Sequence, residues 1–128
     1  MKSISLLLLL TATFLGCQTS SNTEGGQKSL RHVVMLKFKD SASAEDIKKV
    51  EAAFRALPTQ IKEIKSFEWG INNSPENLAQ GFTHCFFLTF ASEKDRAVYL
   101  PHPAHKAFGA VLTPFLDKVL VLDYWANE

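Results

Sequence analysis

The sequence predicts a single α+β domain with the element order βαββαβ, an antiparallel four-stranded sheet with helices on one face. Three observations predict this fold class. Apolar side chains alternate with a period of two in four segments, they recur at helical spacing in two others, and each helical segment lies between two strand segments. With 46% hydrophobic residues in a chain of 128, there is enough apolar material for a core. An order of this kind favours packing both helices on the same face of the sheet.

The first strand is predicted over residues 31–39. His32, Val34, Leu36 and Phe38 share one side of this segment, and the residues between them share the other. A strand with this alternation rests one face on the core, so these four side chains are expected to point inward.

The first helix is predicted to begin after Ser43, which with Asp46 forms a variant of the capping box. Its apolar positions follow helical spacing up to Leu57, and Pro58 is expected to end it. Residues 61–65 are a candidate for one further helical turn, and the alternating residues 67–71 are the predicted second strand.

Residues 81–90 carry the clearest strand pattern, and they follow a polar loop over residues 72–80. Both faces of this third strand are largely apolar. A strand of this kind is covered by helices on one side and by another protein surface on the other. The sequence therefore predicts a homodimer, because a lone sheet would expose an apolar face.

A short helix is predicted from Ser92 to Tyr99, and Pro103 suits the first position of the second main helix. His102 between two prolines is predicted to be a turn or cap residue. Residues 118–125 are the predicted last strand. The stripe of the second main helix contains His105, Phe108, Leu112 and Phe115.

Residues 1–16 are predicted to be a signal peptide, with a basic start at Lys2 and an apolar run too short to span a bilayer. Phe14-Leu15-Gly16-Cys17 resembles a bacterial lipobox. Cys17 would then be lipidated and become the first residue of the mature protein. The alternative is an ordinary secretory peptide with an incidental cysteine.

Residues 17–29 contain no large apolar side chain and are rich in Ser, Thr, Gln and Gly, so they are predicted to be the lipidated cysteine and a flexible tether. Residues 30–128 form the folded domain. With the lipid on Cys17, the domain is expected in a bacterial cell envelope, held on a membrane and facing the periplasm or the exterior.

The net charge argues against nucleic-acid binding, and the cysteine content argues against a disulfide. A net charge of +1 provides no field for binding nucleic acid, and the two cysteines lie in segments too different to predict a disulfide. Cys85 is predicted to be an inert strand cysteine. No metal site and no cofactor are predicted.

Four segments together are similar to the stress-responsive A/B barrel (Dabb) family, and the similarity covers residues 30–124. The most specific is the His-Pro-x-His element that ends at His105. The resemblance implies a ferredoxin-like protomer that dimerises through its sheet into a closed α+β barrel, with a small hydrophobic cavity between sheet and helices. The segments are RHVVMLKFK at 31–39, Phe82-Thr83-His84, Tyr99-Leu100-Pro101-His102-Pro103-Ala104-His105, and Leu122-Asp123-Tyr124.

The resemblance also implies a site. In a family member that closes a polyketide ring by aldol condensation, the catalytic tyrosine and histidine correspond to Tyr99 and His105, and two further pocket histidines correspond to His32 and His84. An imidazole accepts a proton near pH 7, and a phenol donates a hydrogen bond to an enolate.

A structural interpretation remains open for each of these residues. His105 and Tyr99 also fit as packing residues, and if the first and third strands are antiparallel, His32 and His84 lie at opposite ends of the pair. Two functions therefore stay open. One is a membrane-anchored protein that binds a small hydrophobic ligand and performs acid–base chemistry on a carbonyl compound; the other is a non-catalytic stress-response or structural dimer with a filled barrel.

Overall fold

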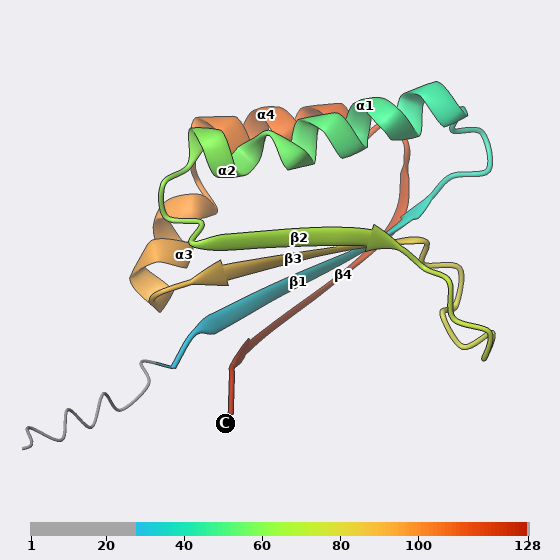
Figure 1. Ribbon diagram of the computed structural model, residues 1–128. Coiled ribbons are helices and arrows are strands. Elements are labelled where there is room, and N and C mark those ends of the chain that lie inside the picture. Colours follow the sequence, from blue (N-terminus) through green and yellow to red (C-terminus); the bar gives the residue numbers. More distant parts are fainter. Residues whose placement is uncertain (1–27, 128) are drawn as a thin grey trace, which may run out of the picture.

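A four-stranded antiparallel sheet carries all of the helices on one of its two faces (Figure 1). The structure is a computed structural model that describes residues 28–127. Its elements, in chain order, are β1 (Leu30–Phe38), α1 (Ala44–Arg55), α2 (Leu57–Gln60), β2 (Ser66–Ile71), β3 (His84–Phe90), α3 (Glu93–Tyr99), α4 (Pro103–Leu112) and β4 (Leu116–Trp125).

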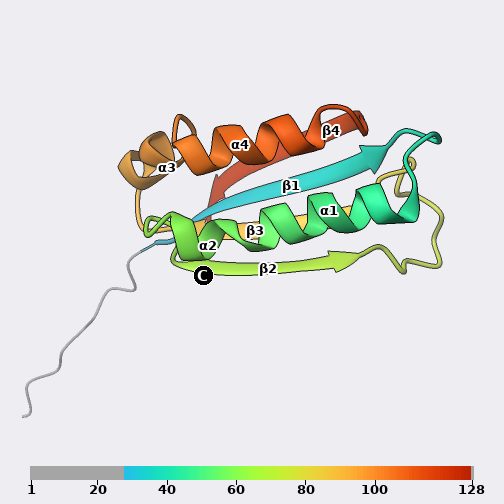
Figure 2. The same ribbon diagram turned by 90° about the horizontal axis from the view of Figure 1, so that it is seen from above.

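The strands lie in the order β2-β3-β1-β4, and every neighbouring pair is antiparallel. This arrangement is the ferredoxin-like fold, so the predicted class is confirmed. Seen from above, α1 lies over β3 and α4 lies on the β4 side of the sheet (Figure 2). The arrangement leaves β4 as an edge strand beneath α4.

The core lies between the sheet and the helices, as the alternation in β1 and β3 predicts. His32, Val34, Leu36 and Phe38 of β1 are all buried on this face. Aromatic rings fill its centre, because Phe54 of α1 stacks on Phe86 of β3 with ring centroids 4.0 Å apart and meets Phe108 of α4 at 4.4 Å. These rings join both helices to the central strand.

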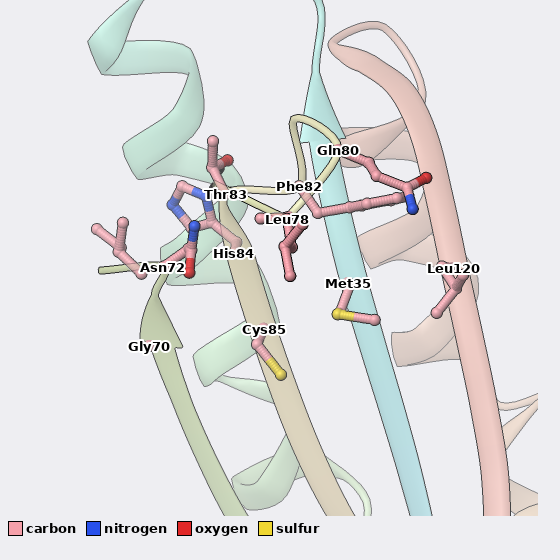
Figure 3. Close-up of a pocket in the computed structure, with 12 residues that line it drawn as sticks. Met35, Gly70, Asn72, Leu78, Gln80, Phe82, Thr83, His84, Cys85 and Leu120 are labelled. Carbon is pink, nitrogen blue, oxygen red and sulfur yellow. Dashed lines mark hydrogen bonds between the residues drawn. The ribbon is translucent and has the colours of Figure 1, made fainter. Parts of the chain in front are cut away.

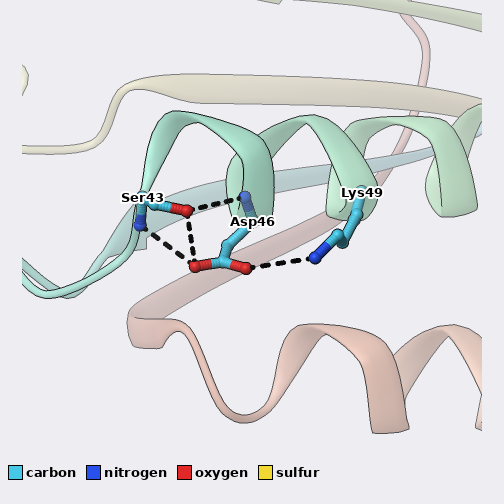
Figure 4. A network of polar contacts seen from close by, with 3 residues as sticks. All are labelled: Ser43, Asp46 and Lys49. Atoms are coloured by element: carbon cyan, nitrogen blue, oxygen red, sulfur yellow. Dashed lines mark hydrogen bonds and ion pairs between the residues drawn. The ribbon is translucent and has the colours of Figure 1, made fainter.

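The predicted capping box at the start of α1 is confirmed (Figure 4). The backbone N–H of Asp46 donates to Ser43 Oγ at 3.1 Å, and the N–H of Ser43 donates to Asp46 Oδ2 at 3.2 Å. Lys49 lies 3.5 Å from the same carboxylate. The hydrogen bonds from Ser43 hold the pKa of Asp46 below its usual value, so the carboxylate stays charged beside the helix N-terminus.

Pro58 does not end the first helix, contrary to the prediction. α1 ends at Arg55, and Pro58 is the second residue of α2. Proline is tolerated there because the first N–H groups of a helix have no intrahelical partner. The further turn predicted over 61–65 is also displaced, since the helical residues are 57–60.

The third strand begins at His84, three residues later than predicted. Gln80 and Gly81 have φ values of +52° and +84°, which no strand residue adopts. Gly81 suits this position because glycine adopts a positive φ without strain, whereas the Lys37 Cε that would lie 2.7 Å from a Cβ at Gly81 is at the end of a flexible side chain that is able to move away. The first and last strands of the chain differ less: β1 covers residues 30–38 instead of 31–39, and β4 begins at Leu116 instead of Lys118.

Local capping interactions begin both helices of the second half, as predicted. The Ser92 side chain accepts a hydrogen bond from the N–H of Asp95, and Pro103 is the first residue of α4. His102 is the N-cap of α4, where its Nδ1 accepts from the N–H of Ala104 at 3.1 Å. These caps fix the turn that separates Tyr99 from α4.

The middle of the sheet face away from the helices is apolar and is uncovered in the protomer, whereas Arg31 and Lys37 lie toward its two ends. Val33 pairs with Phe87 on one side and with Leu122 on the other, so the three side chains form a row across β3, β1 and β4. Leu122 is 51% exposed. Met35, Cys85 and Leu120 form the next row by the same register.

Within residues 28–127, no helix is both long enough and apolar enough to cross a bilayer. The predicted signal peptide, Cys17 and the tether up to residue 27 lie outside the residues that the structure describes.

Candidate functional site

A cavity of about 520 Å³ lies between the helix-covered face of the sheet and the α3–α4 segment, on the side of the edge strand β4. This volume is within the usual range of small-molecule sites, roughly 300–1,000 Å³. Most of the lining is apolar, and the polar side chains come from β1, α3, α4 and β4. The lining residues are His32, Val34, Phe54, Arg96, Tyr99, Leu100, His105, Phe108, Gly109, Leu112, Val119, Val121 and Asp123.

Tyr99 is the last residue of α3 and is fully buried at the cavity wall. Its ring lies 4.4 Å from that of His105 and 5.6 Å from that of His32, measured between centroids. Within residues 28–127, its hydroxyl has no hydrogen-bond partner. Burial raises the pKa of Tyr99, so the hydroxyl keeps its proton and remains a donor.

His105 lies in the first turn of α4, half-buried beside Tyr99. Its Nδ1 is 2.9 Å from the carbonyl oxygen of Leu100. A carbonyl oxygen only accepts, so Nδ1 carries the proton and the neutral ring has its lone pair on Nε2. The local backbone therefore fixes the tautomer in which Nε2 is able to take a proton.

His32 is buried on β1 and bonded to a carboxylate from the neighbouring strand. Its Nδ1–H donates to Asp123 Oδ1 at 2.9 Å, and Arg96 Nη1 lies 3.0 Å from the same oxygen. Burial acts to raise the pKa of Asp123, but hydrogen bonds from His32 and Arg96 outweigh it and hold this pKa below its usual value. The carboxylate is therefore ionised at neutral pH, and it orients the His32 ring.

Asp123→Asn should lower stability at neutral pH, by an amount that shrinks in acid. Because the folded pKa of Asp123 is depressed, its carboxylate stabilises the fold above the unfolded pKa of about 4. This contribution disappears as the pH falls through the folded value. Urea unfolding of both proteins between about pH 6 and pH 2 measures the difference, and a difference independent of pH would contradict the role of the carboxylate.

Three of the four residues that the family resemblance implies for the site lie together: Tyr99, His105 and His32. His84 does not line this cavity. In the antiparallel β1–β3 pair, His84 is opposite Leu36 whereas His32 is opposite Leu88, so the two histidines lie toward opposite ends.

His84 has its own partners at that end. Its Nε2–H donates to Glu51 Oε1 of α1 at 2.9 Å, and Thr83 Oγ1 lies 2.8 Å from Nδ1. Both ring nitrogens are thus engaged, and the side chain links β3 to α1.

Sequence reasoning did not identify Asp123 and Arg96 as site residues. Asp123 is in the Leu122-Asp123-Tyr124 segment, but only the β1–β4 register places it opposite His32. Arg96 has one sequence signal, its position three residues before Tyr99 on the same short helix, which puts both side chains on one face.

A second hollow of about 410 Å³ lies on the far face of the sheet, beside the loop between β2 and β3. Figure 3 shows Met35, Cys85 and Leu120 on three neighbouring strands, with Phe82 from the loop beside them. Burial and, to a smaller extent, Glu68 raise the pKa of the Cys85 thiol, which disfavours the reactive thiolate.

The part of the chain that the structure describes contains no cluster of three or more His, Cys, Asp or Glu side chains able to hold a metal ion.

Comparison with known proteins gives a family match over nearly all of the folded region. The family described as Stress responsive A/B Barrel Domain (Dabb) matches residues 30–126. The stress-response A/B barrel domain-containing protein HS1 of Arabidopsis thaliana is 42% identical over 101 residues, which are 79% of this chain and 93% of that protein. Olivetolic acid cyclase of Cannabis sativa is 32% identical over 96 residues, 75% of this chain and 95% of that enzyme.

Solved structures show the same fold. The hydroxynitrile lyase from Passiflora edulis superimposes with a TM-score of 0.75 at 31% identity, covering 80% of this chain and 96% of that one. A dimeric protein of unknown function with a ferredoxin-like fold, from Bacteroides fragilis, has a TM-score of 0.64 at 26% identity and covers 77% and 96% of the two chains.

Proposed function

The chain belongs to the stress responsive A/B barrel domain family, and from its cavity we propose that it binds a small apolar carbonyl compound and moves a proton on it by general acid–base catalysis. The observation that carries this proposal is the Tyr99 hydroxyl, which is buried at the cavity wall without a partner among the described residues. An unpaired buried hydroxyl costs about 1–3 kcal/mol. A ligand oxygen in the cavity supplies the missing acceptor.

His105 and Tyr99 divide the chemistry between them. Nε2 of His105 takes the proton from the carbon next to the carbonyl, and the electron pair of that C–H bond forms the enolate. The enolate oxygen accepts a hydrogen bond from the Tyr99 hydroxyl, whose raised pKa keeps its proton in place. Returning the proton from Nε2 to carbon completes the cycle, so the proposed reaction needs no cofactor.

Two similar proteins have names that denote enzymes, a cyclase and a hydroxynitrile lyase. Their coverage of the same folded region supports an active cavity in this chain. The apolar lining from Val119, Val121 and Leu112 favours a substrate with a hydrocarbon portion.

Exchange of carbon-bound protons in D₂O tests the proposal directly. We expect the protein to accelerate loss of the α-proton NMR signals of 2-octanone above the rate in buffer alone. His84→Gln is the matched control for a His105→Gln variant. His84 lies outside the cavity, so His84→Gln should keep the exchange. If 2-octanone binds and its α-protons do not exchange, the protein is a binding module; if the ketone does not bind, the carbonyl proposal is wrong.

We also propose that two protomers associate through the uncovered face of the sheet. The apolar row of Val33, Phe87 and Leu122 supports it, as does the dimeric Bacteroides fragilis protein of the same fold. We expect sedimentation of the domain at tens of micromolar to give a dimer, and Leu122→Glu to give a monomer. Val98→Glu, on the exposed side of α3, should leave the dimer intact, and a wild-type monomer would contradict the proposal.

A lipid anchor on Cys17 is the third part of the proposal, and it rests on the sequence of residues 1–17. Several acyl chains would hold the protein permanently on a bacterial membrane. We expect intact mass to show a lipidated chain beginning at Cys17, and Cys17→Ser to lose both the lipid and the processing that exposes residue 17. A Cys17→Ser protein that stays in the membrane fraction at unchanged mass would refute the anchor.

A further inference from the structure

We propose that Arg96 makes the cavity selective for a keto acid, in which a carboxylate lies a few bonds from the ketone and an apolar chain continues beyond it. The inference rests on the proposed carbonyl chemistry and adds the substrate class. Among the described residues that line the cavity, Arg96 is the one with a lysine or arginine side chain. The guanidinium is permanently charged, and the side chain is 25% exposed.

The contacts of Arg96 leave most of its donors available. A guanidinium has five N–H donors, and Arg96 forms an ion pair through Nη1, which lies 3.0 Å from Asp123 Oδ1. That oxygen also accepts from His32, so the carboxylate is shared between two donors. A ligand carboxylate fits the remaining donors, because the guanidinium fork matches its two oxygens.

The position of Arg96 sets the spacing of the two ligand groups. Arg96 Nη1 lies 3.0 Å from Asp123 Oδ1, the oxygen that also accepts from His32, and the His32 ring centroid lies 5.6 Å from that of Tyr99. A ketone oxygen on the Tyr99 hydroxyl and a carboxylate on Arg96 therefore belong to a molecule with only a few bonds between them. The apolar chain then has Val119, Val121 and Leu112 as its lining.

The counter-charge at the site is Asp123, which leaves the Arg96–Asp123 pair without net charge, so the preference for an acid has to come from the Arg96 donors that Asp123 does not use. Its carboxylate holds the Nδ1–H of His32 as well as Arg96, so a bound anion adds to the contacts of Arg96 without having to displace the Asp123 bond. The ligand carboxylate is expected beside Arg96 at the α3 side of the cavity, away from the apolar lining of β4.

The test compares 4-oxodecanoate with its methyl ester, which has the same ketone and chain without the charge. By NMR titration of the wild type, we expect the acid to bind roughly ten to a hundred times more tightly, as charge-assisted hydrogen bonds imply. Arg96→Met should reduce this ratio to near one, and Arg96→Lys should leave an intermediate ratio because the charge remains without the planar fork. Lys94→Met is the matched control, an exposed cation on the same helix, and it should keep the wild-type ratio.

Equal binding of acid and ester by the wild type would overturn the inference, whatever the variants do. So would a wild-type ratio in a folded Arg96→Met protein. Exchange of the α-protons of the ester in D₂O is read in the same samples and depends only on the carbonyl site. Exchange without acid preference refutes the role of Arg96 and leaves the proposed function standing, whereas absence of binding and exchange for both probes refutes the two together.

Discussion

His105→Gln is expected to slow proton exchange of a bound ketone by roughly 10²–10⁴-fold, the usual contribution of a positioned base. Glutamine has no basic nitrogen to replace Nε2. In the wild type, the Leu100 carbonyl accepts a hydrogen bond from His105 Nδ1–H. The amide N–H of glutamine is able to donate to the same carbonyl, so the turn before α4 should keep this contact. Exchange in D₂O measured by NMR, with urea unfolding of the same samples, separates a loss of chemistry from a loss of fold.

Tyr99→Phe is the companion variant, and it should reduce the rate of exchange without reducing the free energy of unfolding. It removes a hydroxyl that has no protein partner within the described residues, so the free energy of unfolding should stay unchanged or rise by roughly 1 kcal/mol. Exchange should fall by roughly 10²-fold or more, because the enolate loses its donor. A Tyr99→Phe protein that is destabilised and still active would show that the hydroxyl serves the fold, and a His105→Gln protein that unfolds would make His105 a packing residue.

Phe86→Ala should have the largest effect on stability, lowering the free energy of unfolding by about 3–5 kcal/mol. The Phe86 ring is fully buried, lies 4.0 Å from Phe54 and 5.6 Å from Trp69, and belongs to the central strand β3. Its removal leaves a cavity bounded by aromatic rings from α1 and β2. Because a domain of this size is stable by only about 5–15 kcal/mol, the variant should unfold at much lower urea concentration.

Urea unfolding at one protein concentration measures this loss, since an associating protein shows concentration-dependent stability. Val98→Ala is the matched control, because Val98 is exposed on α3, and its effect should stay within about 0.5 kcal/mol. Equal effects of the two substitutions would contradict the placement of the core between the sheet and the helices.

Much of the fold follows from sequence patterns because they act over short distances. The period-two alternation in β1 and β3 places every second side chain against the helices, whatever the neighbouring strands are. The capping box at Ser43 and the cap at His102 involve residues two or three apart, so they are readable from the chain. One error falls at Pro58, because a proline is compatible both with the end of one helix and with the first turn of the next, and the residue type does not tell the two apart. The other falls at Gly81, because a glycine in the sequence does not reveal that its φ is positive.

Part of the candidate site likewise follows from the sequence, and part of it is decided only by the tertiary structure. Tyr99 and His105 are separated by a short capped turn, so the sequence alone makes them neighbours, and the resemblance to the family implies their roles. The His32–Asp123 contact joins residues 91 positions apart and exists only through the β1–β4 register. A slip of one residue would turn Asp123 to the opposite face. The antiparallel β1–β3 pairing likewise separates His84 from His32, because strand direction and register are properties of the assembled sheet and not of any one strand.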